Sequence, residues 1–230
     1  MAVYSVPSDL HSIKEMFQSS NLDSVWDSIK IDFKNFNNLA AQNLSKVFMF
    51  FSLAFRNPSC EIYNILKESL PYFDELFLEY TDKTTELPDI LDLQAEYVRL
   101  FVSNKDGVPA SPYASVYLSS DGLLYGDCLI RLKKLMSETG FELKEGYKEL
   151  EDNIYIILEY LSLMLERLDV EKEKAIKGFL ITSYLFLQPM CERFCENIIN
   201  NTTLNFYEAL AECLLKITKD LDEIIEDIFV

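Results

Sequence analysis

The pattern that most constrains this chain is the recurrence of apolar residues at intervals of three and four positions. It is clearest near the C-terminus, in the series Phe206, Leu210, Leu214, Ile217, Leu221, Ile224, Ile225 and Ile228. Such spacing places apolar side chains on one face of an α-helix, whereas a half-buried strand needs strict alternation. The 230 residues include only 6 Gly and 7 Pro, so few tight turns are encoded. An all-α fold is therefore expected.

The same spacing predicts where the helices lie. An early helix should end at Asn57-Pro58, and a second should bend at Pro71, because proline interrupts helical hydrogen bonding. Pro88 is expected in the first turn of a third. The predicted helical ranges are Leu39–Ala54, Ile62–Leu78, Pro88–Phe101, Leu123–Met136, Leu150–Leu168, Lys172–Ile199 and Leu204–Phe229. With 49% hydrophobic residues and this length, residues 1–230 are expected to form one domain.

Residues 102–122 interrupt the helical pattern. The segment is rich in Ser, Gly, Asn and Pro, yet it carries Tyr113, Val116 and Tyr117 close together. Because a disordered linker rarely holds so many large apolar residues, we expect an ordered loop that packs on the helices or lines a site.

The charge excludes some partners. The 38 acidic and 21 basic residues give a net charge of -17, which repels a nucleic acid backbone. The same charge attracts a basic peptide, or simply keeps the protein soluble. Met1–Ser19 has no signal-peptide pattern, and the most apolar stretch, Val47–Phe55, is too short to span a bilayer. We expect a cytoplasmic protein with no stable membrane insertion.

Nothing in the sequence predicts catalysis, a metal or a cofactor. His11 is the only histidine, and no glycine-rich phosphate-binding motif occurs. The five cysteines include no CxxC pair, so a disulfide framework or zinc site is not expected. Cys191 and Cys195 are four apart on a predicted helix, but no histidine accompanies them.

Three short motifs follow one another in the middle of the chain. Residues 96–101 are E-Y-V-R-L-F, residues 109–118 are P-A-S-P-Y-A-S-V-Y-L, and residues 122–126 are G-L-L-Y-G. The series resembles the signature of the TorD, DmsD and NarJ type chaperones, in which a helix ending Y-x-x-L-F precedes a loop with P-P-W-x-S-V-Y and an aromatic-glycine step. Tyr113 stands where many members have tryptophan.

A second family motif, E-P-x-D-H at the start of a long helix, resembles residues 149–153, which are E-L-E-D-N. Both acids are kept, while Leu150 replaces the proline and Asn153 replaces the histidine. In the family the Asp-His pair is tied to leader-peptide binding and to nucleotide effects, and Asn153 removes the ionisable imidazole. The L-Q-P step at residues 187–189 and the N-F-Y-E-A-L-A run at 205–211 resemble later family helices.

This resemblance implies an all-α, single-domain bundle of roughly ten helices that acts as a chaperone and is not an enzyme. Its partners would be the catalytic subunit of a molybdopterin oxidoreductase and that subunit's twin-arginine leader peptide, bound before cofactor insertion and export. The family resemblance also implies a monomer or a helix-swapped homodimer. Two alternatives stay open: a nucleotide-binding switch in which Asp152 helps to hold a metal-bound phosphate, and a generic helical assembly factor.

A twin-arginine leader presents two guanidinium groups and then an apolar stretch, so its receptor needs carboxylates and an apolar surface. The candidate peptide-binding residues are Tyr97, Phe101, Pro112, Tyr113, Ser115, Tyr117, Asp121, Tyr125, Gly126, Asp127, Glu151, Asp152, Asn153 and Glu159. Structural roles compete with this interpretation. Phe101 is typical of core packing, and Asp152 and Asn153 are typical of a helix cap. Arg99 is expected to form an ion pair with Glu96 or Asp127.

Overall fold

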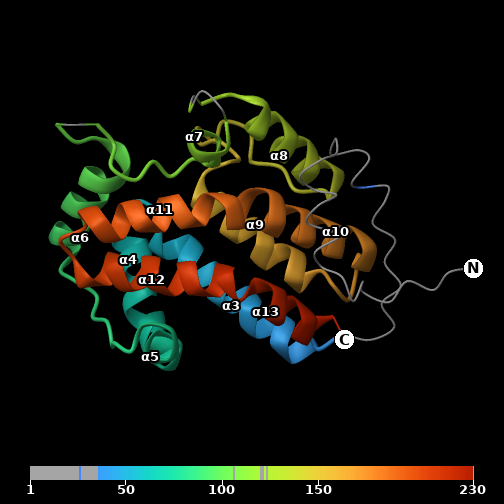
Figure 1. The fold of residues 1–230 in the computed structure, drawn as a ribbon, viewed down its shortest axis with the longest axis horizontal. Coiled ribbons are helices and arrows are strands. Elements are labelled where there is room, and N and C mark those ends of the chain that lie inside the picture. Colours follow the sequence, from blue (N-terminus) through green and yellow to red (C-terminus); the bar gives the residue numbers. More distant parts are fainter. Residues whose placement is uncertain (1–25, 27–35, 106, 120–121, 123, 230) are drawn as a thin grey trace, which may run out of the picture.

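The computed structural model describes residue 26 and residues 36–229, apart from residues 106, 120, 121 and 123. Within these ranges the structure is helical and contains no β-strand (Figure 1), as the sequence predicts. The α-helices are α3 (Asn38–Ala54), α4 (Cys60–Ser69), α5 (Asp74–Thr81), α6 (Ile90–Tyr97), α7 (Ala114–Leu118), α8 (Asp127–Glu138), α9 (Ile154–Glu166), α10 (Lys172–Thr182), α11 (Gln188–Asn201), α12 (Asn205–Lys219) and α13 (Leu221–Ile228). A 3₁₀ segment, η1 (Leu70–Phe73), joins α4 to α5, and the π-helical segments η2 (Val98–Val102) and η3 (Ser183–Leu187) follow α6 and α10.

Polar side chains cap the N-termini of α3 and α4. Asn37 Oδ1 accepts the N–H of Ala40 at 3.2 Å at the start of α3, and Ser59 Oγ accepts the N–H of Ile62 at 3.2 Å at the start of α4. These bonds satisfy backbone donors that have no partner within the helix. The predicted break at Asn57-Pro58 is confirmed, since α3 ends at Ala54.

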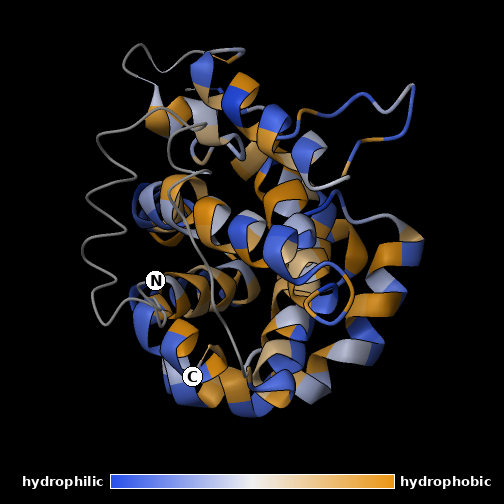
Figure 2. Cartoon of the chain, turned by 90° about the vertical axis from the view of Figure 1, so that its right-hand side faces the viewer, coloured by the Kyte–Doolittle hydropathy of each residue, from blue (hydrophilic) through white to orange (hydrophobic). Residues whose placement is uncertain are grey.

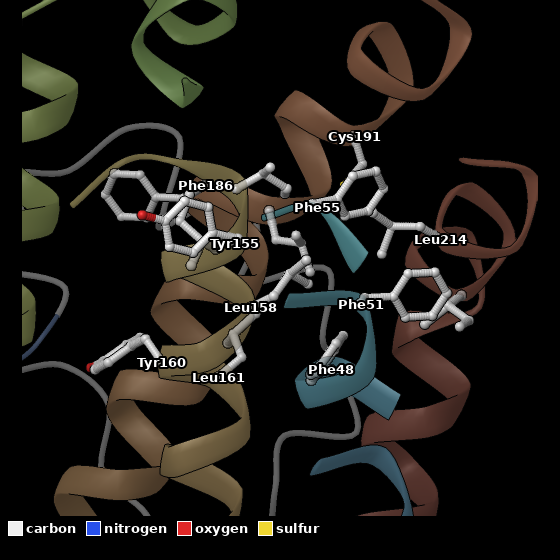
Figure 3. Packing of buried hydrophobic residues seen from close by; sticks show 14 of the residues in the cluster. Phe48, Phe51, Phe55, Tyr155, Leu158, Tyr160, Leu161, Phe186, Cys191 and Leu214 are labelled. Atoms are coloured by element: carbon white, nitrogen blue, oxygen red, sulfur yellow. The ribbon is translucent and has the colours of Figure 1, made fainter. Parts of the chain in front are cut away.

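Helices α3 and α9 lie side by side at the centre of the molecule (Figures 1 and 3). Phe48 and Phe51 of α3 and Leu158 and Leu161 of α9 are fully buried between them. Burying each such side chain stabilises the fold by roughly 1.5–3 kcal/mol. The interface contains few polar contacts, such as Ser45 Oγ, which lies 2.9 Å from Ser162 Oγ.

Helices α11 and α12 pack against each other and hold the end of α6 (Figure 1). The ring of Phe101, in η2, lies between those of Phe194 in α11 and Tyr207 in α12, with centroid distances of 6.1 and 5.4 Å. Phe55, at the end of α3, contacts Phe101 at 6.2 Å. This aromatic cluster confirms that Phe101 belongs to the core.

A buried carboxylate ties α6 to the connection between α11 and α12. Glu96 is 5% exposed and accepts two hydrogen bonds of 2.7 Å from Arg99, one of 2.8 Å from the Thr202 hydroxyl and one of 2.6 Å from the Thr203 N–H. Burial opposes ionisation of Glu96, but these hydrogen bonds and the Arg99 charge outweigh it and lower its pKa to about 2. Of the two partners predicted for Arg99, the structure selects Glu96.

Several predicted helix bounds need correction. Pro88 precedes α6 instead of lying in its first turn, because Asp89 is the N-cap. The predicted helix Lys172–Ile199 is interrupted by η3, and the helix Leu204–Phe229 is divided at Asp220 into α12 and α13. The loop 102–122 contains the short helix α7. The divisions at η3 and at Asp220 occur where the apolar spacing continues while the backbone geometry changes.

Hydrophobic and hydrophilic residues alternate along the same helices (Figure 2), as amphipathic packing requires. The side chains of lowest exposure form a single hydrophobic cluster to which most of the helices contribute. In the part of the chain that the structure describes, no helix combines the length and apolar content that crossing a bilayer demands.

Candidate functional site

The motif loop is fixed to the start of α9 by main-chain hydrogen bonds. The N–H of Ala114 donates to the carbonyl of Asp152 at 2.8 Å, and the N–H of Ile154 donates to the carbonyl of Pro112 at 2.8 Å. These bonds frame an isolated antiparallel bridge between Tyr113 and Asn153. The two motifs that were predicted to share a site are thus in direct contact.

The side chains of residues 152 and 153 reinforce this contact. Asn153 Oδ1 accepts the N–H of Tyr155 at 3.2 Å, so the predicted capping role of Asn153 is confirmed. Asp152 Oδ2 accepts the N–H of Ser115 at 2.9 Å, near the start of α7. Asp152 therefore joins the two segments instead of capping its own helix.

The Asp152 carboxyl group is completely buried, and its Oδ1 atom has no hydrogen-bond partner. Burial raises its pKa above the ordinary value, and the hydrogen bond from Ser115 only partly offsets that effect. The folded state therefore holds the carboxyl proton more tightly than the unfolded state does. The stabilisation that this proton provides is complete below the unfolded-state pKa of 3.8 and is lost as pH rises through the folded-state pKa.

Replacing Asp152 by asparagine is expected to raise the free energy of unfolding at pH 7 by about 1 kcal/mol, because a neutral amide avoids the cost of ionising a carboxyl group in a buried position. Asparagine keeps an oxygen for the Ser115 N–H and carries no charge. Urea denaturation at pH 7 and pH 3 checks this: the gain should largely vanish at pH 3, where the wild-type carboxyl group is protonated. A loss of stability at pH 7 would contradict the argument.

Tyrosine hydroxyls and carboxylates line the outer side of this contact. The Tyr113 hydroxyl donates to Glu149 Oε1 at 2.7 Å, and the Tyr147 and Tyr155 hydroxyls lie 3.0 Å apart. Burial and the Glu149 carboxylate both raise the pKa of Tyr113, so its hydroxyl stays protonated. The Arg56 guanidinium lies 4.8 Å from the centroid of the Tyr155 ring.

Most of the predicted acidic residues already have partners. Glu159 forms an ion pair with Arg56, and Glu151 forms one with Lys133 at 3.2 Å. Asp127 is exposed at the start of α8 and has no ion pair within the described residues. Asp121 lies outside the described residues.

The predicted aromatic residues differ widely in exposure. Tyr97 is 8% exposed, and burial raises its pKa to about 12. Tyr117 is half-buried, donates to the carbonyl of Ser111 at 2.8 Å and packs on Phe194. Tyr125 is 70% exposed. In this conformation Tyr125 is available to a partner, whereas Tyr97 and Phe101 serve packing.

Tyr125 has a backbone φ of 65°, a conformation that non-glycine residues rarely adopt. It precedes Gly126, the N-cap of α8, where a Cβ atom would lie 3.0 Å from Ser119 Oγ. The positive φ of Tyr125 and the tight space at Gly126 define the backbone of the turn that leads into α8.

Sequence reasoning missed several residues of this region. Glu149 was part of the motif but not a candidate, and Tyr147, Tyr155 and Arg56 were not considered. The two tyrosines flank the motif, which was a usable local signal. Arg56 lies about a hundred residues away from Glu159, and no local pattern indicates that pair.

Among the described residues, no three His, Cys, Asp or Glu side chains lie close enough together to hold a metal ion. Cys191, Cys195 and Cys213 are free buried thiols. Burial raises the pKa of Cys213 to about 12 and that of Cys195 well above its ordinary value, so these thiols are unreactive.

The sequence also matches a known protein family. The model of the family described as nitrate reductase delta subunit matches residues 60–200. The chaperone protein TorD of Vibrio parahaemolyticus is 29% identical over 134 residues, which cover 56% of this chain and 62% of the relative. The Tat proofreading chaperone DmsD of Salmonella typhimurium is 29% identical over 120 residues, which cover 52% and 55%. The matches therefore span about three fifths of these curated relatives.

A crystal structure of a redox enzyme maturation protein from Archaeoglobus fulgidus has the same fold. It superimposes with a TM-score of 0.55 at 22% identity and covers 83% of this chain and 98% of that protein. The family match includes the motif loop, the start of α9 and most of α11, which together form the contacts described above. The chain belongs to the nitrate reductase delta subunit family.

Proposed function

We propose that this protein is a cytoplasmic maturation chaperone, not an enzyme, whose client is the catalytic subunit of a molybdopterin oxidoreductase. It binds the twin-arginine leader of the client, the body of the client before its cofactor is inserted, or both, and it delays export until insertion is complete. Family membership and the names of the relatives support this proposal.

The observation that carries the proposal is the direct contact between the motif loop and the start of α9. The hydrogen bonds between the motif loop and the start of α9 bring Tyr113 and Glu149 to one surface. Tyr125 and Asp127 follow the motif loop in the chain, and both are exposed. A guanidinium group stacks on aromatic rings and donates hydrogen bonds to carboxylates, so both kinds of side chain favour its binding. The net charge of -17 adds long-range attraction for a cationic peptide.

The test is calorimetric titration of the purified protein with a synthetic twin-arginine leader from the oxidoreductase encoded beside it, at low and high salt. A lysine-lysine version of the same peptide serves as control, because lysine keeps the charge and loses the planar donor geometry. Leader recognition predicts binding that weakens with salt and with the lysine exchange. Pull-down of the oxidoreductase subunit tests binding of the client body separately.

Two tyrosine variants locate the site. Tyr125→Ala is expected to weaken leader binding by about tenfold, the effect of losing a buried aromatic contact in a complex. Tyr72→Ala is the matched control, because Tyr72 is 85% exposed on η1 and lies outside both motifs. Equal binding by the two variants would exclude Tyr125 from the site. Absence of both leader binding and client pull-down for the wild type would overturn the proposed function.

A further inference from the structure

One face of α6 and η2 carries apolar side chains that the described part of the chain leaves uncovered. Leu91, Val98 and Val102 are 73%, 46% and 54% exposed, and Ala95 is also exposed. Their spacing of four, three and four residues places them on one side of the helix. We call these four residues the α6 stripe.

The α6 stripe is not needed for packing, because the opposite side of the same helix is buried. Leu93 and Leu100 are at most 1% exposed there, and Glu96 binds Arg99 and Thr202. A helix that is apolar on two sides either lies inside a protein or binds a partner. Figure 1 shows α6 at the edge of the molecule, so the described part of the chain does not enclose this face.

The two ends of the stripe differ in charge. Glu86, Asp89 and Asp92 are exposed at the end where α6 begins, and none of them forms an ion pair with any residue the structure describes. At the other end, Val102 and the 42% exposed Val108 flank the exposed Lys105. The stripe therefore runs from an unpaired acidic group to an end that carries a cation.

The chain that follows the stripe leads into the motif loop. The N–H of Ala110 donates to the carbonyl of Leu100 at 3.0 Å, which holds the start of the motif loop against η2. The Val102 end of the stripe therefore lies nearer to the motif loop than the Leu91 end. The acidic end lies farthest from this loop.

We propose that the α6 stripe is a docking surface for a further segment of the client, apart from the arginines that would bind beside Tyr113 and Glu149, and that this segment carries cationic residues at one end of an apolar run. The apolar run packs on Leu91, Val98 and Val102, and the cationic end faces Glu86, Asp89 and Asp92. Leu91 and Val102 are about 16 Å apart along the axis, so about three helical turns of the segment suffice. This inference rests on the proposed function for the existence of a client, and it adds where and in which direction a segment binds.

Size and charge argue against a second copy of this chain as the occupant. A stable protein interface takes about 800 Å² and 20 or more residues from each partner, whereas the stripe offers four apolar side chains, one of them alanine. Two copies that each carry a net charge of -17 also repel each other. A peptide segment with cationic residues fits both observations.

The experiment measures fluorescence anisotropy of a labelled synthetic peptide with two arginines followed by a leucine- and alanine-rich run of about three helical turns. Leu91→Glu is compared with Leu39→Glu. Both leucines are exposed, at 73% and 67%, and each is the second residue of its helix, so helix effects are matched. We expect Leu91→Glu to weaken binding by about tenfold or more and Leu39→Glu to leave it unchanged.

A second matched pair tests the direction. Glu86 and Asp169 are both exposed acids in connections between helices. Glu86→Lys should weaken binding at low salt, with a difference that shrinks at high salt, while Asp169→Lys should have little effect. The wild type should bind a peptide in which glutamates replace the two arginines less well than it binds the arginine peptide. The difference in affinity between these two peptides should be smaller for Glu86→Lys than for the wild type.

Equal peptide binding by Leu91→Glu and Leu39→Glu overturns the docking surface. If Glu86→Lys and Asp169→Lys have equal effects, the proposed direction is wrong. Pull-down of the oxidoreductase subunit with wild type and Leu91→Glu separates this inference from the function. If the wild type recovers the subunit and Leu91→Glu binds the peptide as well as the wild type does, the docking surface is rejected and the function is kept. If the wild type neither recovers the subunit nor binds the leader, the function is rejected.

Discussion

Replacing Glu96 by glutamine is expected to lower the free energy of unfolding by about 3 kcal/mol at pH 7, because it leaves the charge of Arg99 without its partner. Glutamine also substitutes an amide group for one of the two oxygens that accept hydrogen bonds from Arg99, Thr202 and Thr203. Urea denaturation measures the change. Glu68→Gln, at an exposed glutamate on α4, is the control and should have almost no effect.

The effect of Glu96→Gln should depend on pH in a defined direction. The folded-state pKa of Glu96 is about 2, below the ordinary value of 4.5, so its stabilisation is complete above pH 4.5 and is lost as pH falls toward 2. The difference between wild type and Glu96→Gln should therefore shrink over that interval. A difference that stays constant from pH 6 to pH 2 would show that the network does not depend on the charge of Glu96.

Replacing Gly178 by alanine is expected to destabilise the protein by about 2 kcal/mol, although alanine is about 1 kcal/mol better than glycine within a helix. A Cβ atom at this position in α10 would overlap the Tyr160 hydroxyl and would lie 2.9 Å from Met164 Sδ and 3.0 Å from Thr139 Cγ2. Tyr160 cannot turn away easily, because its hydroxyl lies 2.9 Å from Thr139 Oγ1 in the core.

A double-mutant cycle tests the cause. Tyr160→Phe removes the overlapping oxygen, so Gly178→Ala should cost clearly less in that background than in the wild type. Thermal or urea unfolding of the four proteins provides the comparison. If Gly178→Ala lowers the free energy of unfolding equally in both backgrounds, the close approach of α9 and α10 at Tyr160 does not explain the need for glycine at position 178.

Apolar spacing predicted the helical fold because the helices bury one face each. Helices α3 and α9 were located to within a few residues, and the bend at Pro71 was also found. The π-helical segment η3 was missed, since Tyr184, Leu185, Phe186 and Leu187 form an unbroken apolar run without a period. A short local pattern contains no information about a change of helix type within such a run.

The candidate site was only partly predictable for a different reason. The motifs identified the loop and the start of α9, and the structure brings them together at Tyr113 and Asn153. The hydrogen bond between Glu96 and Thr202 and the ion pair between Arg56 and Glu159 each join residues about a hundred positions apart. Such pairs depend on tertiary packing, and which candidates bind a partner stays a prediction.

The contact between the motif loop and α9 has a consequence for how such a protein changes over evolution. Its two central bonds join backbone atoms of Ala114, Asp152, Pro112 and Ile154, so they do not require particular side chains at Tyr113 or Asn153. Tyrosine in place of tryptophan and asparagine in place of histidine leave this frame intact. The side chains at these two positions can therefore change without loss of the architecture that presents them.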